Sequence, residues 1–298
     1  MNKMCLAQVL VLWLSSPLSD VSAAEHATTP DTAKIEQLTG AKGKLDAAEN
    51  VFKVTVPRND LTVTVAGVKM TPATGFTSWA AFTPAGDKTM VMGDMVLQEN
   101  QINPVMSTAL ENGIEVSALH NHFLWDTPKI MFMHIGGSGD MEKLATGVGK
   151  VFAKIKETGN VKQLKRIAFD AGKTSLDPKP IEAIIAAPVE KTGEVYKVTL
   201  GRTTQMDGHT MGKIMGVNTW AVFAGSDNKA IVEGDFAVLE SELQGVLKAL
   251  RAADVAITSI HNHMVGESPR IVFLHYWGAG TVSDLAKAIK AAIDAQSE

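Results

Sequence analysis

The chain has 298 residues, of which 45% are hydrophobic and 20% are charged, and its mean hydropathy is +0.06. These values are typical of a globular protein with a sizeable core. The formal net charge is −4 and no basic tract occurs, which argues against a nucleic-acid partner. The sequence also lacks the glycine-rich fingerprints of nucleotide sites and the Gly-x-Ser-x-Gly elbow of serine hydrolases, so we expect no nucleotide cofactor.

The N-terminus has the pattern of a secretory signal peptide. Lys3 precedes an apolar stretch over residues 6–14, and small residues surround Ala23 and Ala24. We therefore predict a signal peptide over residues 1–24 and a periplasmic or secreted mature protein. No lipid anchor is expected, because Cys5 lies too early in the apolar stretch to form a lipobox. No later apolar run is long enough to span a membrane.

The rest of the chain is predicted to hold two tandem copies of one domain, because its similarity at an offset of 141 residues runs without a gap from Gly75 to Gly139. In the first copy, hydrophobic patterns predict strands over 51–56, 61–65, 78–82 and 89–96, a helix over 100–112, a β-hairpin, and a closing helix over 140–158 capped by Asp140 or Ser138. Matching helices are expected over 241–253 and 283–295, the latter capped by Ser283 and Asp284.

This order of elements indicates an α+β fold. We place the first repeat at 31–158, a connection at 159–176 and the second repeat at 177–298, with 177–180 as the extended end of the connection. Each repeat is predicted to be an antiparallel sheet with two helices on one face, in a ferredoxin-like arrangement. The two repeats are expected to pack about a pseudo-two-fold axis.

Six of the eight histidines lie in the hairpins of the two copies, which makes these hairpins the candidate site. In a strand, residues i and i+2 share a face, so His120 and His122 point the same way. If the turn centres near Thr127, His134 on the return strand lies opposite His120, and the three rings can converge. The second set is His261, His263 and His275.

Three imidazoles on one face are the ligands of a zinc or copper site with an open fourth position, and we favour zinc over copper. A single histidine more often has a structural role, hydrogen-bonded within a half-buried sheet. The repeated triple reverses that expectation. Asn121 and Asn262, on the opposite face, are predicted to serve the backbone or to support the ligands.

Four acidic residues near the histidines are candidates for a general base or a further ligand. Asp126 and Glu267 lie in the hairpin turns, where acids are usually solvated. Asp94 and Asp235 each follow a glycine near the predicted end of a strand. They are predicted either to cap the next element or to place a carboxylate at the edge of the site.

The first copy is also rich in methionine, whose thioether is a soft ligand for copper(I). The second copy has apolar residues at four of the five equivalent places, so most of these methionines are predicted to fill the core. The five are Met90, Met92, Met95, Met131 and Met133.

The motifs of both copies resemble the LppY/LpqO family of bacterial secreted proteins and lipoproteins. The similarity rests on segments 78–82, 91–94, 113–116, 118–122, 128 and 132–134, and on their counterparts 220–223, 233–235, 261–263, 269–270 and 275–278. The resemblance covers nearly all of the mature chain and implies an envelope location. The family has no known function, so the resemblance implies no mechanism.

Three functions fit these observations. The first is a periplasmic protein that binds a transition metal through the two histidine sets, with an open coordination position that could activate water for hydrolysis. The second is a metal-free binding module for a small molecule or a cell-envelope ligand, such as a glycan or peptidoglycan fragment. In that case a groove would be lined by the histidines together with Trp79, Trp125, Trp220 and Trp277. The third is a purely structural envelope protein. The sequence leaves open whether the two histidine sets form one site or two.

Overall fold

A computed structural model describes residues 29–159 and 168–296. The signal peptide predicted over 1–24 lies outside the described residues, as does the part of the predicted connection at 160–167. Among the described helices, none is long and apolar enough to cross a membrane.

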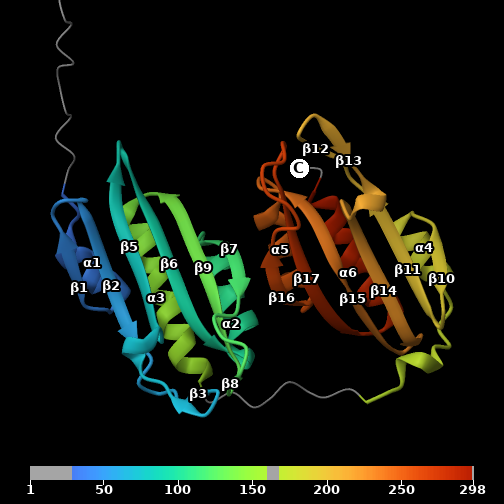
Figure 1. Cartoon of the computed structure of the whole chain (residues 1–298), viewed down its shortest axis with the longest axis horizontal. Coiled ribbons are helices and arrows are strands. Elements are labelled where there is room, and N and C mark those ends of the chain that lie inside the picture. The colour runs from blue at the N-terminus through green and yellow to red at the C-terminus, as the bar shows by residue number, and fades with distance from the viewer. Residues whose placement is uncertain (1–28, 160–167, 297–298) are drawn as a thin grey trace, which may run out of the picture.

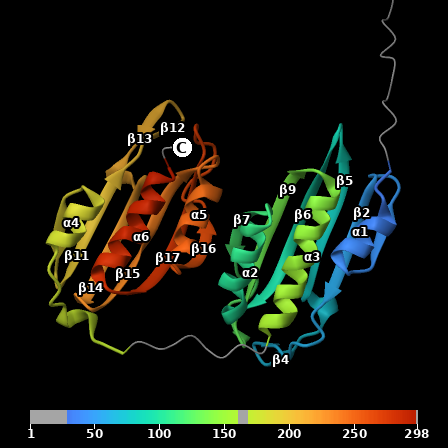
Figure 2. The same cartoon turned by 180° about the vertical axis from the view of Figure 1, so that it is seen from behind.

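The first repeat is a six-stranded antiparallel sheet with three helices on one face (Figures 1 and 2). Its strands are β1 (Gly43–Asp46), β2 (Val51–Pro57), β5 (Thr77–Ala85), β6 (Lys88–Gln98), β7 (Glu115–His120) and β9 (Ile130–Gly139). Its helices are α1 (Thr32–Thr39), α2 (Glu99–Glu111) and α3 (Met141–Thr158). A small sheet joins β3 (Thr64–Val65) to β4 (Val68–Lys69) and to β8 (Asp126–Thr127) in the histidine hairpin.

The second repeat has the same elements in the same order. Its strands are β10 (Val189–Thr192), β11 (Val195–Gly201), β14 (Asn218–Ser226), β15 (Lys229–Leu239), β16 (Ala256–His261) and β17 (Ile271–Gly280). Its helices are α4 (Lys179–Ile185), α5 (Leu243–Ala252) and α6 (Val282–Asp294). A separate hairpin pairs β12 (Thr204–Met206) with β13 (His209–Met211).

The two half-sheets join edge to edge into one twelve-stranded sheet. Its strand order is β1-β2-β5-β6-β9-β7-β16-β17-β15-β14-β11-β10. The central contact pairs Leu119 of β7 with Ile260 of β16, which are equivalent residues of the two repeats. The pseudo-two-fold axis therefore passes between these two strands. Within each repeat the crossover is split, since β9 lies between β6 and β7 and β17 lies between β15 and β16.

Two side-chain amides clamp the join in a symmetric way. Gln244 of α5 accepts a hydrogen bond from the Val116 amide at 3.0 Å and donates one to the Val116 carbonyl at 2.9 Å. Its equivalent, Asn103 of α2, accepts from the Ile257 amide at 2.8 Å and donates to the Ile257 carbonyl at 3.5 Å. Each amide replaces the backbone partner that the short β7–β16 ladder does not supply.

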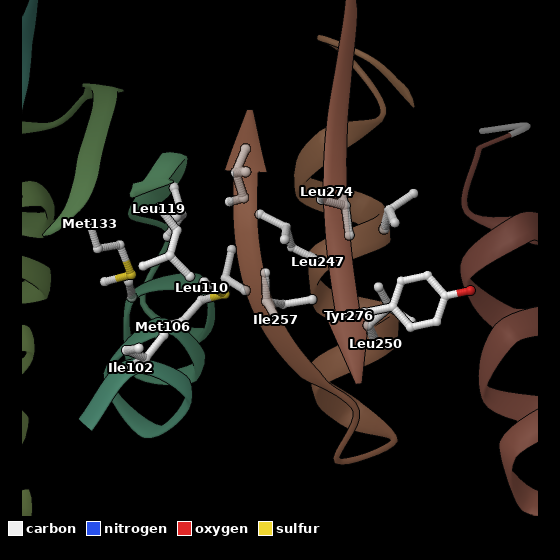
Figure 3. Packing of buried hydrophobic residues seen from close by; sticks show 14 of the residues in the cluster. Ile102, Met106, Leu110, Leu119, Met133, Leu247, Leu250, Ile257, Leu274 and Tyr276 are labelled. Atoms are coloured by element: carbon white, nitrogen blue, oxygen red, sulfur yellow. The ribbon is translucent and has the colours of Figure 1, made fainter. Parts of the chain in front are cut away.

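The core lies between the sheet and the helices and is continuous across the pseudo-two-fold axis. Figure 3 shows Met106 of α2 and Leu247 of α5 on either side of Ile257 in the central strands. The helices contribute apolar residues at helical spacing, such as Val148, Val151 and Ile155 of α3. Within residues 29–159 and 168–296, no helix covers the opposite face of the sheet, here called the helix-free face (Figure 1).

Several predicted element boundaries need correction. The prediction missed a helix in each repeat, α1 and α4, because each is short and has only two buried residues, Ile35 and Thr39 in α1 and Ile181 and Ile185 in α4. Residues 177–180 were expected to be extended, but Pro178 caps α4, which begins at Lys179. Proline suits a helix N-terminus, where its missing N–H costs nothing. Helix α6 is capped by the Thr281 hydroxyl rather than by Ser283 or Asp284, whereas Asp140 does cap α3.

Candidate metal centre

Both histidine clusters lie on the helix-free face of the sheet, near its centre. Asp94 of β6 pairs with His134 of β9, which pairs with Ala118 of β7. The neighbouring Met95 and Met133 are buried in the core on the helix side. Since successive residues of a strand point to opposite faces, Asp94 and His134 face away from the helices.

The rings of His120, His122 and His134 lie close together, as predicted, but the register of β7 against β9 differs from the predicted one. His120 pairs with Phe132 and not with His134, because the hairpin is centred on Asp126 rather than on Thr127; the bulge between Val116 and Ala118 lies beyond the pair formed by His134. A two-residue difference keeps His134 on the same face, and its ring centroid lies 5.0 Å from that of His120. The His120 and His122 centroids are 5.2 Å apart.

A phenylalanine positions the middle histidine of each cluster. His122 stacks on Phe132 with ring centroids 3.4 Å apart, and His263 stacks on Phe273 at 3.5 Å. Both phenylalanines are buried, so they give the imidazole a fixed surface to lie on. The aromatic contact therefore limits where His122 and His263 can point.

The second repeat brings three donor atoms to the spacing of a metal site. Ligand atoms of Asp235, His261 and His263 all lie within 4.8 Å of one another. His263 Nε2 is 3.2 Å from His261 Nε2 and 3.3 Å from Asp235 Oδ2. Ligands bound to zinc at about 2.0–2.1 Å in a tetrahedron are separated by about 3.3–3.4 Å. The two observed separations match that edge length.

Each histidine of the second cluster is held on its Nδ1 side. The Nδ1 of His261 lies 3.5 Å from the Ser259 hydroxyl, and the Nδ1 of His275 donates to the Gly234 carbonyl at 3.0 Å. The Nδ1 side of His263 faces Gly216, whose backbone hydrogen-bonds this histidine. The Nε2 atoms are thereby left for the site, which is how ligand histidines are usually oriented. His275 stacks on His261 with centroids 4.9 Å apart but lies outside the close donor group.

The Asp235 carboxylate is buried without full compensation. Its side chain is 3% exposed, and Oδ1 has no hydrogen-bond partner among the described residues. Burial raises the pKa of Asp235 from its ordinary 3.8 to about 6, against the opposing effects of His275 and of a backbone hydrogen bond from Leu274. Burial, followed by the neighbouring histidines, lowers the pKa of His261 to about 4. Burial thus disfavours the charged form of both groups.

The first cluster has the same groups in a looser arrangement. Asp94 Oδ1 is also buried without a partner among the described residues, and burial raises the pKa of this carboxyl. His120, however, turns its Nδ1 toward the Asn121 carbonyl at 3.4 Å. Ala118 stands where the second repeat has Ser259, so the hydroxyl that faces His261 has no counterpart beside His120.

The four acidic candidates divide into two pairs. Asp94 and Asp235 lie within long strands, so the interpretation that they cap a following element is wrong, and both face the histidines. The hairpin-turn acids instead hold the turn. Asp126 accepts hydrogen bonds from the Ile130 amide at 2.7 Å and from Lys129 at 3.0 Å, and Glu267 accepts one from the Ile271 amide at 3.1 Å.

Other residues singled out in the sequence lie around this face. Trp125 and Trp277 are 69% and 44% exposed, and Trp79 pairs with Asp94 across the β5–β6 ladder. Met95 and Met133 fill the core as predicted, whereas Met90 and Met92 are exposed. The orienting groups Ser259 and Gly216 were not identified from sequence, because neither residue type indicates a site without knowledge of the register.

The comparisons with known proteins bear mainly on family membership. No curated protein matches the sequence. Two solved structures are similar at 12% identity and a TM-score of 0.20, a level that supports no inference. One is the trimeric bacterial microcompartment shell protein PduB, with 85% of this chain and 89% of that chain covered. The other is the double-ringed trimeric shell protein MSM0271 from the RMM microcompartment, with 72% and 85% covered.

The model of a protein family described as a Domain of Unknown Function (DUF1259) matches residues 33–154 and again residues 179–295. The two matches coincide with the two structural repeats. The chain therefore belongs to the DUF1259 family and carries two tandem copies of its domain.

Proposed function

We propose that each repeat binds one transition-metal ion, with zinc favoured, on the helix-free face of the sheet. In the second repeat the ligands are Asp235, His261 and His263, with His275 beside them. The equivalent set is Asp94, His120, His122 and His134. The observation that carries the proposal is the close group of donor atoms at the buried Asp235 carboxylate: His263 Nε2 lies 3.3 Å from Asp235 Oδ2 and 3.2 Å from His261 Nε2, and the ligand atoms of all three residues lie within 4.8 Å of one another.

A metal-free hydrogen-bonded cluster explains less of this geometry. A proton between His261 and His263 would account for their 3.2 Å separation. It would leave the Asp235 oxygen unpaired, and a buried carboxylate without a counter-charge costs several kcal/mol. A divalent cation bound at Oδ2 supplies the missing counter-charge. It also explains why the Nδ1 side of each histidine is occupied.

Such a site supports metal-assisted hydrolysis. A zinc ion with three protein ligands keeps a position for water and lowers the pKa of that water to about 7. None of the described helices covers this face of the sheet, and the His263 side chain is 35% exposed, so a substrate can approach from solvent. Asp126 and Glu267 are engaged in the hairpin turns, which leaves activation of the water to the metal.

Metal content tests the proposal directly. The full-length mature protein is loaded with zinc, dialysed, and analysed by elemental mass spectrometry. We expect two ions per chain, about one in the His122→Ala or His263→Ala variant, and none in the double variant. His209→Ala is the matched control, since it removes a histidine on β13 outside both clusters. Stoichiometric zinc in the double variant, or no uptake by the wild type, would overturn the proposal.

The exposure of Trp125 and Trp277 favours a second candidate, a metal-free module for a cell-envelope glycan or peptidoglycan fragment. Aromatic rings at a solvent-facing surface suit a ligand with one apolar side. The two candidates differ in the effect of a chelator. Glycan binding that survives complete removal of metal favours the module, and binding that disappears with the metal favours the first proposal.

We also propose an exported protein of the LppY/LpqO type. The support is the N-terminal pattern of residues 1–24 and the quoted motifs. Intact-mass measurement of the native protein should give a chain that starts at Ala24 or Glu25, and a retained Met1 would contradict export. For the fold of each repeat we propose a ferredoxin-like arrangement in permuted order, supported by the split crossover and by β5 lying beside β6.

A further inference from the structure

Two lysines of the first repeat lie directly opposite each other on neighbouring strands. Lys44 of β1 pairs with Lys53 of β2. Like charges at directly opposed positions destabilise a sheet. Among the residues that the structure describes, neither ammonium has a carboxylate within 4.0 Å. The pair is therefore a basic patch that the protein itself does not neutralise.

The patch lies on the helix-free face and leads toward the first metal site. Lys53 lies with its ammonium 3.9 Å from the centroid of the Trp79 ring, a cation–π contact that limits the positions of the charge. Trp79 in turn pairs with Asp94. The row of Lys44 and Lys53 continues to Ala81 and Met92, and Asp94 lies two residues farther along β6. With strands about 4.8 Å apart and a rise of about 3.4 Å per residue, Lys44 and Asp94 are about 16 Å apart along the sheet.

The second repeat keeps the lysine–tryptophan contact but has acidic residues at neighbouring positions. Its lysine, Lys197, packs over Trp220 at 4.8 Å in the same way. Its opposed residue is Glu190, where the first repeat has Lys44. Glu233 also takes the place of the exposed Met92. The basic row thus occurs in only one of the two copies, although both keep the lysine–tryptophan pair.

We propose that Lys44, Lys53 and Trp79 form an anion-binding subsite beside the metal of the first repeat. The ligand is an extended acidic chain, with one anionic group on the metal and another on the lysines. A single small anion is too short to contact both the metal and the two lysines. The chain is a carboxylated oligosaccharide or a polymer of phosphodiesters, which share this chemistry. The metal end rests on the proposed function, whereas the lysine end stands on its own geometry.

Binding to zinc-loaded full-length protein tests the subsite by calorimetry. The probes are a trimer of galacturonic acid, a trimer of glycerol phosphate, and maltotriose as the neutral chain. We expect one of the acidic trimers to bind, weakening as salt rises, and maltotriose not to bind. The tighter of the two acidic trimers identifies the carboxylate or the phosphate source.

Substitutions then locate the anion. Losing one charge-assisted contact is expected to weaken the acidic trimer about tenfold in Lys53→Gln, and Lys53→Arg should retain most of the affinity. Lys197→Gln is the matched control and should bind as the wild type does. Equal affinity of wild type and the Lys44→Gln/Lys53→Gln double variant would overturn the subsite, as would equal binding of maltotriose.

The metal end is tested separately. In His122→Ala, zinc content reports the first metal site, and trimer affinity reports the anionic subsite. Weaker trimer binding that remains sensitive to Lys53→Gln supports a ligand spanning both. If the wild type takes up no zinc but Lys53→Gln still weakens the trimer, the metal proposal fails and the anionic subsite stands.

Discussion

Asp235→Asn should have opposite effects with and without metal. The substitution keeps the shape of the side chain and removes a negative charge that is buried with one oxygen unpaired among the described residues. The pKa of Asp235 rises from 3.8 to about 6 in the folded protein. At 1.36 kcal/mol per pKa unit, ionisation of this carboxyl costs the metal-free fold about 3 kcal/mol at pH 7.5. The metal-free variant should therefore be more stable than the wild type by up to that amount.

The sign of the pH dependence follows from the raised pKa. The fold favours the protonated acid, so this contribution to stability is fully present below pH 3.8 and is lost as pH rises through about 6. An asparagine does not ionise and escapes the loss, so the advantage of the variant should shrink as pH falls toward 4. With zinc at one hundred times its dissociation constant, a site gains about 2.7 kcal/mol, and the variant should lose that gain in its second repeat.

Urea unfolding of the wild type and the variant measures the free energy of unfolding in each of four conditions: with chelator or with zinc, at pH 7.5 and at pH 4.5. Glu233→Gln is the control, since it neutralises an exposed acid two residues earlier in the same strand. Two results would refute the reasoning. One is a metal-free Asp235→Asn protein that is less stable than the wild type at pH 7.5. The other is zinc stabilisation of the variant equal to that of the wild type.

Three further changes test the supporting structure. Ser259→Ala removes the hydroxyl beside Nδ1 of His261 and should weaken zinc binding in the second repeat about 10- to 100-fold. A competitive chelator titration measures this affinity, and an unchanged value would argue against orientation of His261 by the hydroxyl. Gln244→Ala leaves the Val116 amide and carbonyl without their partner and should lower the free energy of unfolding by about 1–3 kcal/mol in urea, whereas a neutral effect would show that water replaces the clamp. Burial would raise the pKa of Asp126, but hydrogen bonds from the Ile130 amide and Lys129 outweigh it and lower that pKa. Asp126→Asn should therefore lower the free energy of unfolding by about 1–3 kcal/mol at pH 7. The difference from wild type should fade as pH drops below 3.8 and the native carboxyl protonates, and urea unfolding across that pH range measures it.

The sequence indicated the location of the site better than its full composition. Alternation along a strand places His120 and His122 on one face whatever the register, and an error of two residues still left His134 beside them. Asp235 was harder to assign. Its position next to the histidines depends on the β15–β17 ladder, which joins segments some forty residues apart and has no local signature. The repeated Gly-Asp pair was the available signal, and two opposed interpretations of it stayed open until the register was known.

Fold prediction succeeded where a pattern was long and failed where it was short. The amphipathic stretch of α3 extends over eighteen residues and was placed within one residue at its start. Helices α1 and α4 have eight and seven residues, too few for a periodic pattern to stand out. Met90 was expected in the core because its counterpart Ile231 is apolar, but it is exposed, as is Met92, whose counterpart is Glu233.

The small join between β7 and β16 has a consequence for how the molecule holds together. The opposed pair of Leu119 and Ile260, the two amide clamps, a hydrogen bond from Arg251 to Ser107 and the shared core connect surfaces that belong to a single polypeptide. Tethering places the partner surface at an effective concentration on the order of millimolar, so the contact need only be as strong as a modest dimer interface. Cutting the chain between the repeats would turn this closure into a concentration-dependent association, and the halves should separate on dilution.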